Sequence, residues 1–422
     1  MPDRRIIAAF IALNCLAFAP LPAQQPITLN QALNEARRAN ARLPVAATDL
    51  RVVRAQLDET RGRFWPRLLA DGDLHAGTPQ KYATSDARLQ LIALDTLYDG
   101  GRLRTNQSVV RQQLAAAGAG YRMLEKDVEL EVRLAFYDAA RAQTEIATRQ
   151  QGLARLETYR HLVEARRAAG QGVSADLLRV NGRIGSERAE LAAATSRLVE
   201  AKLELNQLMG RVPDTTLELA PLPVPQPPDS VASRQSPWLR TPEVEAATAG
   251  AAIARSGVDL VRAERRPTFA LEGNIGVTPV LGDRTAPALL NTGRGAGAEV
   301  VLSVTLPLWD KGVYHARLEQ AQLARQAAED SLTIAQQQTR LAWMRAEAQL
   351  EGIYRELQIR HQNVDLARDA YLEAESLYRG GGGSSLEVLD AYSDWSDALL
   401  AEADTLLAYR QAEAQLEKWG TP

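Results

Sequence analysis

The chain has 422 residues, enough for roughly two or three ordinary domains. Charged residues make up 24% and the formal net charge is −3, which argues against a nucleic-acid-binding protein, because such proteins carry a basic excess. Aromatic residues make up only 5%, and alanine, leucine, glutamine and arginine fill long tracts. This composition is typical of long, closely packed helices.

The first residues have the pattern of a secretory signal. Arg4 and Arg5 give a positive start, an apolar run follows over residues 6–18, and small Ala23 is a suitable cleavage position. The run is too short to span a bilayer as a helix, and the alternative is a buried N-terminal helix. We therefore predict a signal peptide over residues 1–23 and an exported mature chain.

The single cysteine of the chain is Cys15, inside the predicted signal. The mature chain is therefore expected to have no disulfide and no thiol chemistry. A lipid anchor on Cys15 is an alternative, although Asn14 stands where a small residue is usual for lipidation. No later stretch is apolar over the length of a transmembrane helix, so none is predicted.

The rest of the chain repeats itself, which is the feature to examine first in such a sequence. The segment "LYDGG" from Leu97 is similar to "LWDKG" from Leu308, and "GQGVSADLL" from Gly170 is similar to "GGGSSLEVL" from Gly381. Both offsets are 211 residues (308 − 97 and 381 − 170). We predict a first structural repeat over residues 24–211, a proline-rich linker over 212–237 and a second repeat over 238–422.

Each repeat is expected to contain the same elements in the same order. Pro66 and Pro267, offset by 201 residues, each follow a helical stretch and stop it, because the proline ring cannot continue the hydrogen-bond ladder. Strands are predicted within 66–97 (67–75 and 87–97) and within 267–308 (268–278 and 296–308). The predicted helices are 28–63, 102–169 and 174–209 in the first repeat, and 242–265, 313–379 and 385–419 in the second. The long and returning helices form helical hairpins over about 100–209 and 312–419.

The predicted strands constrain the assembly more strongly than the helices do. Each has the length that a tilted strand needs to cross a bilayer, and strands in lipid must close into a barrel so that no edge stays unpaired. A barrel needs about eight strands, but one chain offers four. Several chains must therefore combine their strands, if these strands enter a membrane.

Aromatic residues stand where the predicted strands meet the helices. Phe64 and Trp65 precede the first strand, and Tyr98 and Trp309 stand at the strand ends before the two long helices. This position favours a membrane-interface belt. The alternative is that ordinary aromatic residues cap a soluble sheet.

Taken in order and duplicated, these motifs resemble the TolC-type outer-membrane efflux proteins over essentially the whole mature chain. The resemblance is carried by "ITLNQALNEARRAN" (27–40), "RGRFWPRL" (61–68), "LPLWDKG" (306–312) and "YRGGGGSSLEVLDA" (378–391). It implies a mainly α fold with membrane β-structure, in which a homotrimer forms a 12-stranded barrel in the outer membrane of a Gram-negative bacterium. The barrel continues into a periplasmic tunnel of helices, and the implied partners are a periplasmic adaptor, an inner-membrane transporter and outer-membrane lipid.

The glycine-rich turns at 170–172 and 380–383 are expected to end the long helices, since glycine adopts the left-handed conformation at little cost. Ser384 and Glu387 have the spacing of a capping box for the returning helix. By resemblance, both turns form the closed periplasmic end of the tunnel. The residues that match the family's gate are Asp176, Tyr378, Glu387 and Asp390. The family's gate arginine aligns with Gly383, which has no side chain, so an arginine–aspartate tether is not expected.

Two further interpretations concern the same tips. The adaptor is expected to dock on residues Gly170, Gly172, Ser174, Gly381, Gly383 and Ser385. For Glu387 and Asp390 the simpler interpretation is that they are favourable acidic charges in the first turn of a helix, a role that is compatible with a gate.

No catalytic pattern is present, so the chain is not expected to be an enzyme or to bind a cofactor or nucleic acid. "GGGGSS" lacks the lysine of a phosphate-binding loop, and the four histidines show no spacing suited to zinc. We predict a passive exit duct of a tripartite efflux system. The alternatives are a type I protein-secretion channel, a periplasmic adaptor, or a soluble structural coiled coil.

Overall fold

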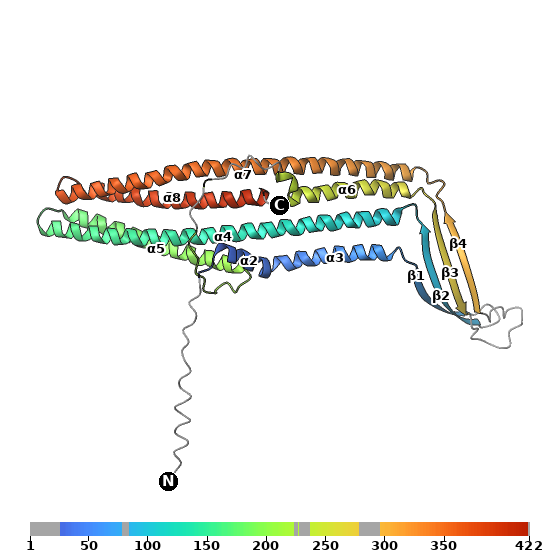
Figure 1. Cartoon of the computed structure of the whole chain (residues 1–422). Helices are drawn as coiled ribbons and strands as arrows, with labels where there is room; N and C mark the ends of the chain where they lie inside the picture. Colours follow the sequence, from blue (N-terminus) through green and yellow to red (C-terminus); the bar gives the residue numbers. More distant parts are fainter. Residues whose placement is uncertain (1–25, 78–83, 223–226, 228–236, 278–295, 421–422) are drawn as a thin grey trace, which may run out of the picture. The chain divides into compact units, whose positions relative to one another are not determined.

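The computed structural model describes residues 26–77, 84–222, 227, 237–277 and 296–420. The predicted signal peptide, with Cys15, lies outside these residues. The chain divides into two compact units, and Figure 1 labels their elements. Unit 1 comprises Met1–Asn40, Glu131–Gln226 and Glu356–Gln411, and unit 2 comprises Ala41–Leu130, Pro227–Arg355 and Ala412–Pro422. None of the described helices contains a stretch of bilayer length with the hydropathy of a transmembrane segment.

Unit 2 holds the sheet, a four-stranded antiparallel array in the order β1-β2-β3-β4. Its strands are β1 (Arg67–Gly77), β2 (Thr84–Tyr98), β3 (Thr268–Val277) and β4 (Ala296–Thr305). The helices α3 (Arg42–Gly62) and α6 (Pro242–Ala263) lead into β1 and β3, and the short 3₁₀ helix η2 (Pro237–Arg240) precedes α6.

The two β-hairpins have the same register. Arg67 pairs with Leu94 in the first hairpin, and Thr268 pairs with Thr305 in the second. Adding the offset of 201 residues to position 67 gives 268, and adding the offset of 211 residues to position 94 gives 305, so the two pairs are equivalent. The two offsets therefore relate structurally equivalent positions of the two repeats.

The sheet has one apolar and one polar face, as the alternation of residues along a strand requires. Leu91, Ile275 and Ala298 lie along one line of register on the first face. On the opposite face, the Gln90 amide donates to the carboxylate of Asp71 at 3.0 Å and the Asn274 amide donates to Glu299 at 3.4 Å. The sheet thus has a surface suited to lipid and another suited to water.

β4 is shorter than the predicted strand 296–308. It ends at Thr305, and Leu306 to Trp309 have no regular structure. Pro307 accounts for the difference, because proline lacks the N–H that a strand ladder uses. Trp309 therefore follows the strand at a distance instead of ending it.

The predicted helix 28–63 is in fact two helices, α2 (Leu29–Ala39) and α3. Asn40 ends α2 in an extended conformation, and its buried side chain donates to the Leu208 carbonyl at 2.9 Å. Because asparagine side chains compete with the helix ladder by bonding to backbone groups, this position favours a break. The periodicity of the flanking residues did not reveal it.

The two long helices begin with the same cap. Asp99 accepts from the Leu103 N–H at 2.6 Å at the start of α4 (Arg102–Ala168). Asp310 accepts from the Tyr314 N–H at 2.9 Å at the start of α7 (Val313–Gly380). An aspartate that accepts from free N–H groups stabilises a helix start. The cap therefore belongs to the repeated "DGG" and "DKG" motifs.

In unit 1, the ends of α4 and α7 are joined to the returning helices α5 (Ser174–Leu208) and α8 (Ser385–Gly420). The start of the described chain is fixed on the connector between the repeats, where Ile27 bridges to Leu219. The Arg211 guanidinium makes a two-point ion pair with Glu35, at 2.6 and 2.5 Å. The connector residues nearest α5 are thus ordered against α2.

Candidate functional site at the helical hairpin tips

Each long helix ends in the same glycine turn. Gly170 and Gly381 have positive φ values of 72° and 87°, which glycine adopts without a Cβ penalty. The Gln171 N–H donates to the Arg166 carbonyl, and the Gly382 N–H donates to the Leu377 carbonyl. This six-to-one bond defines a Schellman motif, so the tight turns at both tips are set by local backbone chemistry.

The capping box predicted for the second tip is confirmed. The Ser384 N–H donates to the Glu387 carboxylate at 2.9 Å, and the Glu387 N–H donates to the Ser384 hydroxyl at 3.3 Å. At the first tip, Val173 takes the cap position and offers no side-chain acceptor. Glu387 stays exposed while it caps α8, so its charge remains available at the surface.

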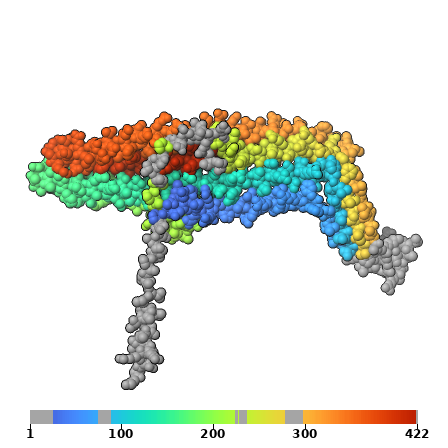
Figure 2. Space-filling view, viewed as in Figure 1, coloured from blue at the N-terminus to red at the C-terminus, as the bar shows by residue number. Residues whose placement is uncertain are grey.

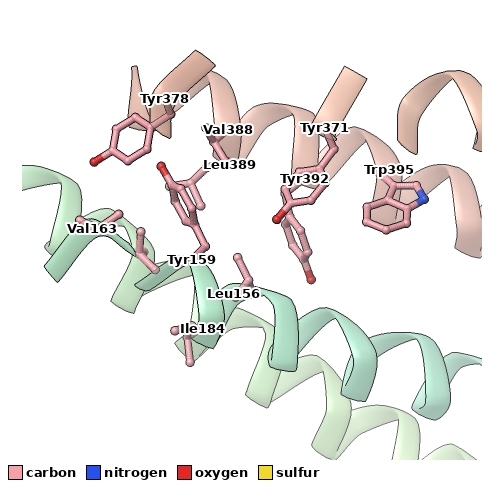
Figure 3. Packing of buried hydrophobic residues seen from close by; sticks show 11 residues of the cluster. Leu156, Tyr159, Val163, Ile184, Tyr371, Tyr378, Val388, Leu389, Tyr392 and Trp395 are labelled. Atoms are coloured by element: carbon pink, nitrogen blue, oxygen red, sulfur yellow. The ribbon is translucent and has the colours of Figure 1, made fainter. Parts of the chain in front are cut away.

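Behind the turns, the two helical hairpins share one buried cluster, which we call the tip cluster (Figure 3). It is built from all four helices of the two hairpins, and in the space-filling view the hairpins lie against each other along this region (Figure 2). Its residues are Leu156, Tyr159, Val163, Val180, Ile184, Tyr371, Tyr378, Val388, Leu389, Tyr392 and Trp395.

Aromatic rings dominate the second hairpin's side of this cluster. Tyr371 of α7 stacks on Trp395 of α8 with centroids 5.3 Å apart and meets the edge of Tyr392 at 6.2 Å. Tyr159 of α4 meets Tyr378 of α7 edge to face at 5.4 Å. The first two contacts join α7 to α8, whereas the last joins the two hairpins.

Three arginines of the first hairpin lie over three rings of the second. The guanidinium of Arg155 is 4.0 Å from the Trp395 centroid, that of Arg166 is 4.6 Å from Tyr378, and that of Arg183 is 5.4 Å from Tyr392. We call these three pairs the arginine–ring clasp. Cation–π pairs contribute about 0.5 to 2 kcal/mol each. The clasp therefore joins the hairpins through three separate pairs, each of moderate strength.

Asp176 and Tyr378, both predicted gate residues, lie close together across the hairpins. Burial, and then the negative charge of Asp176, raise the pKa of Tyr378, while Arg166 acts in the opposite direction. Asp176 is itself nearly buried and pairs with Arg179 at 3.3 Å. Neither side chain lies on an open surface, so both belong to the contact between the hairpins.

In the tip cluster, the indole nitrogen of Trp395 is buried without a protein hydrogen-bond partner among the described residues. The hydroxyls of Tyr159, Tyr378 and Tyr392 are buried as well, and each lies beside a polar side chain, that of Ser385, Asp176 and Ser396 respectively. A buried polar atom without a partner costs about 1 to 3 kcal/mol, so opening the cluster relieves this cost at Trp395.

Within the first hairpin, by contrast, α4 and α5 are joined by buried ion pairs. Glu145 accepts from Arg149 at 3.0 Å and from Arg197 at 2.7 Å, and Arg149 also reaches Glu187 at 3.2 Å. Both glutamates are nearly inaccessible to solvent. Because breaking such a pair leaves an uncompensated buried charge, α4 and α5 are expected to move together.

The exposed face of α8 is acidic. From residue 387 to 409, the exposed positions of this helix are all carboxylates, at steps of three, four or seven residues. These carboxylates, which we call the acidic stripe, are Glu387, Asp390, Asp394, Asp397 and Asp404. Between Ser385 and Tyr409 no lysine or arginine occurs, whereas α5 carries Arg179, Arg183, Arg188 and Arg197. Only the first two members of the stripe were predicted, although the spacing of the others in the sequence could have revealed them.

The sequence profile of the outer membrane efflux protein family matches residues 32–211 and 236–419, which include both hairpins and the sheet. The chain belongs to this outer membrane efflux protein family. The predicted family resemblance is thereby confirmed.

Relatives within the outer membrane efflux protein family share modest identity with this chain. Protein CyaE of Bordetella pertussis is 30% identical over 72% of this chain and 64% of its own length, so the match spans less than two thirds of CyaE. The pyoverdine export outer membrane protein OpmQ of Pseudomonas putida is 24% identical over 99% of this chain and 88% of its own length.

A solved structure of the family confirms the predicted TolC-type fold. The outer membrane protein VceC of Vibrio cholerae superposes with a TM-score of 0.81 and 20% identity, covering 93% of this chain and 96% of VceC. Such a likeness concerns the fold, while the details of the tip come from this chain's own residues.

The remaining predicted site residues of this family member differ in accessibility. Ser385, expected among the docking residues, is 2% exposed, so it supports the tip cluster and is not available to a partner. Gly170, Ser174 and Gly381 are exposed, and Gly172 and Gly383 are half-buried. A Cβ on Gly383 would lie 3.1 Å from the Tyr378 N and 3.2 Å from the Leu377 Cβ, which makes the turn tight for any side chain there.

The four predicted interface aromatics lie where the helices of unit 2 meet the sheet. Phe64 and Trp65 follow α3, Tyr98 is the last residue of β2, and Trp309 follows β4. All four are exposed, Trp65 by 75% and Trp309 by 81%. In the described part of the chain, no three histidine or acidic side chains gather closely enough to hold a metal ion.

Alkaline pH is expected to weaken the tip cluster. Burial raises the pKa of Tyr371 and Tyr392 from 10.0 to about 12, so the folded state keeps protons that the unfolded state loses. Stability from these groups is therefore complete below pH 10 and falls as the pH rises toward 12. Tyr371→Phe and Tyr392→Phe should flatten this dependence in pH-resolved thermal unfolding, whereas Tyr354→Phe, on α7 outside the cluster, should leave it steep.

Proposed function

We propose that this chain is the outer-membrane exit duct of a tripartite efflux system, working as a homotrimer that conducts substrates passively. An inner-membrane transporter would supply the energy and a periplasmic adaptor would join it to the duct. Membership of the outer membrane efflux protein family supports this proposal, and so does the name of OpmQ, an export protein. The family and its solved relatives are channels, and the proposed role of this chain involves no catalysis.

One observation carries the proposal: the four strands form a sheet with an apolar and a polar face, and its two edges are β1 and β4. Strand edges cannot stay unpaired in lipid, and four strands are too few to close a barrel, which needs about eight. Three copies would supply twelve strands, with apolar residues such as Leu91 and Val300 toward lipid. The polar face would line the duct.

The proposed gate is the contact between the two hairpins at the tips. The arginine–ring clasp and the Asp176–Tyr378 neighbourhood would hold α7 and α8 of the second hairpin against the first hairpin at rest. Opening would separate the hairpins as units, because α4 and α5 are tied internally by Glu145 and Glu187. The exposed residues of the two turns would form the docking surface for the adaptor.

Four members of the acidic stripe, Glu387, Asp390, Asp394 and Asp397, are proposed to face the duct, where three copies would form stacked rings of carboxylates, whereas Asp404 pairs with Arg141 of α4. Such rings attract cations and repel anions. Replacing Glu387 by glutamine and Asp390, Asp394 and Asp397 by asparagine should therefore lower cation selectivity, measured as the reversal potential of the purified protein in planar bilayers under a salt gradient. Glutamine at 387 still completes the capping box.

The matched control is Glu190→Gln with Glu200→Gln, two exposed acidic residues of α5, which should leave the reversal potential unchanged. The effect of the stripe should also shrink near 1 M salt, where the Debye length falls to about 3 Å. Unchanged selectivity of the stripe variant would contradict the assignment of α8 to the duct wall. Absence of any conductance from the unmodified protein would contradict the channel itself.

A further inference from the structure

The contact between the two repeats within one chain indicates how two copies of the chain would meet. In the sheet, the boundary between the two repeats is the β2–β3 pair, where Tyr98 and Phe269 are register partners with ring centroids 6.0 Å apart. Just outside the sheet, the Arg266 guanidinium donates to the Gly100 carbonyl at 2.8 Å. These contacts fasten the start of the second repeat to the end of the first repeat's β-hairpin.

The same boundary recurs between copies if copies join through their free edges, β4 and β1. The identical register of the two hairpins means that adding 211 to a β2 position gives its β4 equivalent, and subtracting 201 from a β3 position gives its β1 equivalent. By these offsets Tyr98, the last residue of β2, corresponds to Trp309, which lies beyond the end of β4, and Phe269 of β3 corresponds to Leu68 of β1. In the same way Gly100 corresponds to Lys311, and Arg266 to Trp65.

The equivalent residues are uncovered in a single chain. Trp309 is 81% exposed and Leu68 is 71% exposed, whereas Tyr98 is 44% exposed and Phe269 is half-buried. Trp65 is 75% exposed, and Lys311 makes no ion pair or hydrogen bond with any described residue. Large exposed rings beside an unpaired ammonium are what a missing neighbour would leave.

We propose that Trp309 of one copy packs on Leu68 of the next copy, and that the indole of Trp65 of this next copy lies over the ammonium of Lys311 of the first. We call these two contacts between β4 of one copy and β1 of the next the seam. The seam rests on the homotrimer proposed above and specifies its contacts. Within one chain, the cation of this contact is Arg266, between α6 and β3, and it binds the backbone carbonyl of Gly100. Between copies the positions are exchanged: the cation is Lys311, between β4 and α7, and Trp65 stands where Arg266 stands within the chain. Tryptophan is the best ring partner for a cation, so Trp65 and Lys311 are suited to pair.

Paired cysteines test the seam directly, because Cys15 is the only native cysteine and lies in the predicted signal. Leu68→Cys with Trp309→Cys should form disulfides between copies on oxidation of isolated outer membranes, giving covalent dimers and trimers on non-reducing gels. The matched control is Tyr98→Cys with Phe269→Cys, the equivalent pair inside one chain, which should cross-link while the protein still runs as a monomer. Each single variant should give neither product.

The failures of the seam and of the trimer can be told apart by the mass of the purified protein in detergent. If the protein is a trimer and the control pair cross-links, but residues 68 and 309 do not, the proposed seam is wrong and the proposed trimeric duct is unaffected. A protein that is monomeric in both membrane and detergent overturns both. As a second readout, Trp65→Leu and Lys311→Met should each lower the melting temperature of the trimer. The double variant should lose less than the sum, because the two residues share one contact.

Discussion

Replacing Arg155, Arg166 and Arg183 together by glutamine is expected to open the resting duct. Each substitution removes a guanidinium from the face of a ring of the other hairpin. At about 0.5 to 2 kcal/mol per pair, the three together contribute about 1.5 to 6 kcal/mol. Even the lower end of this range shifts the equilibrium between closed and open tips by roughly tenfold. The open fraction and resting conductance in planar bilayers measure it.

The control for this variant is Arg188→Gln. Arg188 lies on α5 and pairs with Glu157 of α4 at 3.2 Å on the surface, so its loss removes an arginine of the same hairpin that touches no ring. Its resting conductance should equal that of the unmodified protein. If the triple variant stays closed as well, the arginine–ring clasp does not hold the tips together, and the hairpins must be held by the apolar part of the tip cluster.

The distribution of contacts at the tip explains why separation between hairpins is the expected motion. Inside the first hairpin the contacts are buried ion pairs, and inside the second they are ring stacks such as Tyr371 on Trp395. Between the hairpins lie the cation–π pairs and a partly exposed ion pair, in which Arg141 of α4 donates to Asp404 of α8 at 2.5 Å. An ion pair buried with both partners is costly to separate, whereas cation–π pairs contribute about 0.5 to 2 kcal/mol and exposed ion pairs about 0.2 to 1 kcal/mol. The boundary of least resistance therefore lies between the hairpins.

The fold was predictable from the sequence because its signals are repeated. Helix periodicity, two prolines and two glycine turns recur at constant offsets, and each is a local effect of backbone chemistry. Two features were missed: Asn40 breaks a helix by bonding to the distant Leu208 carbonyl, and Pro307 shortens β4. Neither depends on periodicity, so a periodic pattern could not reveal them.

The candidate site was predictable only in part. Asp176 and Tyr378 were predicted as gate residues through family resemblance; they are neighbours in the structure, and their role in a gate stays a prediction. Arg155 and Trp395 are 240 residues apart (395 − 155), and their contact depends on how four helices face one another. No spacing rule connects such residues. Burial was missed for the same reason, so Ser385 was expected at the surface although it is buried.

Replacing Glu145 by glutamine is expected to lower the stability of the fold without changing the resting conductance, whereas the triple arginine variant is expected to raise the resting conductance. The substitution leaves three arginines, Arg141, Arg149 and Arg197, around a neutral amide in a nearly inaccessible position. Breaking a buried ion pair in this way costs about 3 to 5 kcal/mol, which should appear as a lower midpoint in urea unfolding followed by circular dichroism.

The control for Glu145→Gln is Glu157→Gln, which removes a carboxylate that also joins α4 to α5 but is 46% exposed. Exposed pairs contribute about 0.2 to 1 kcal/mol, so its midpoint should change little. Equal losses in the two variants would contradict the view that the buried ion pairs hold the hairpin together. Glu145→Gln should lower stability without raising resting conductance, because it weakens a hairpin internally and leaves the clasp intact. A variant that lowered stability and also opened the duct would mean that the hairpins do not move as units.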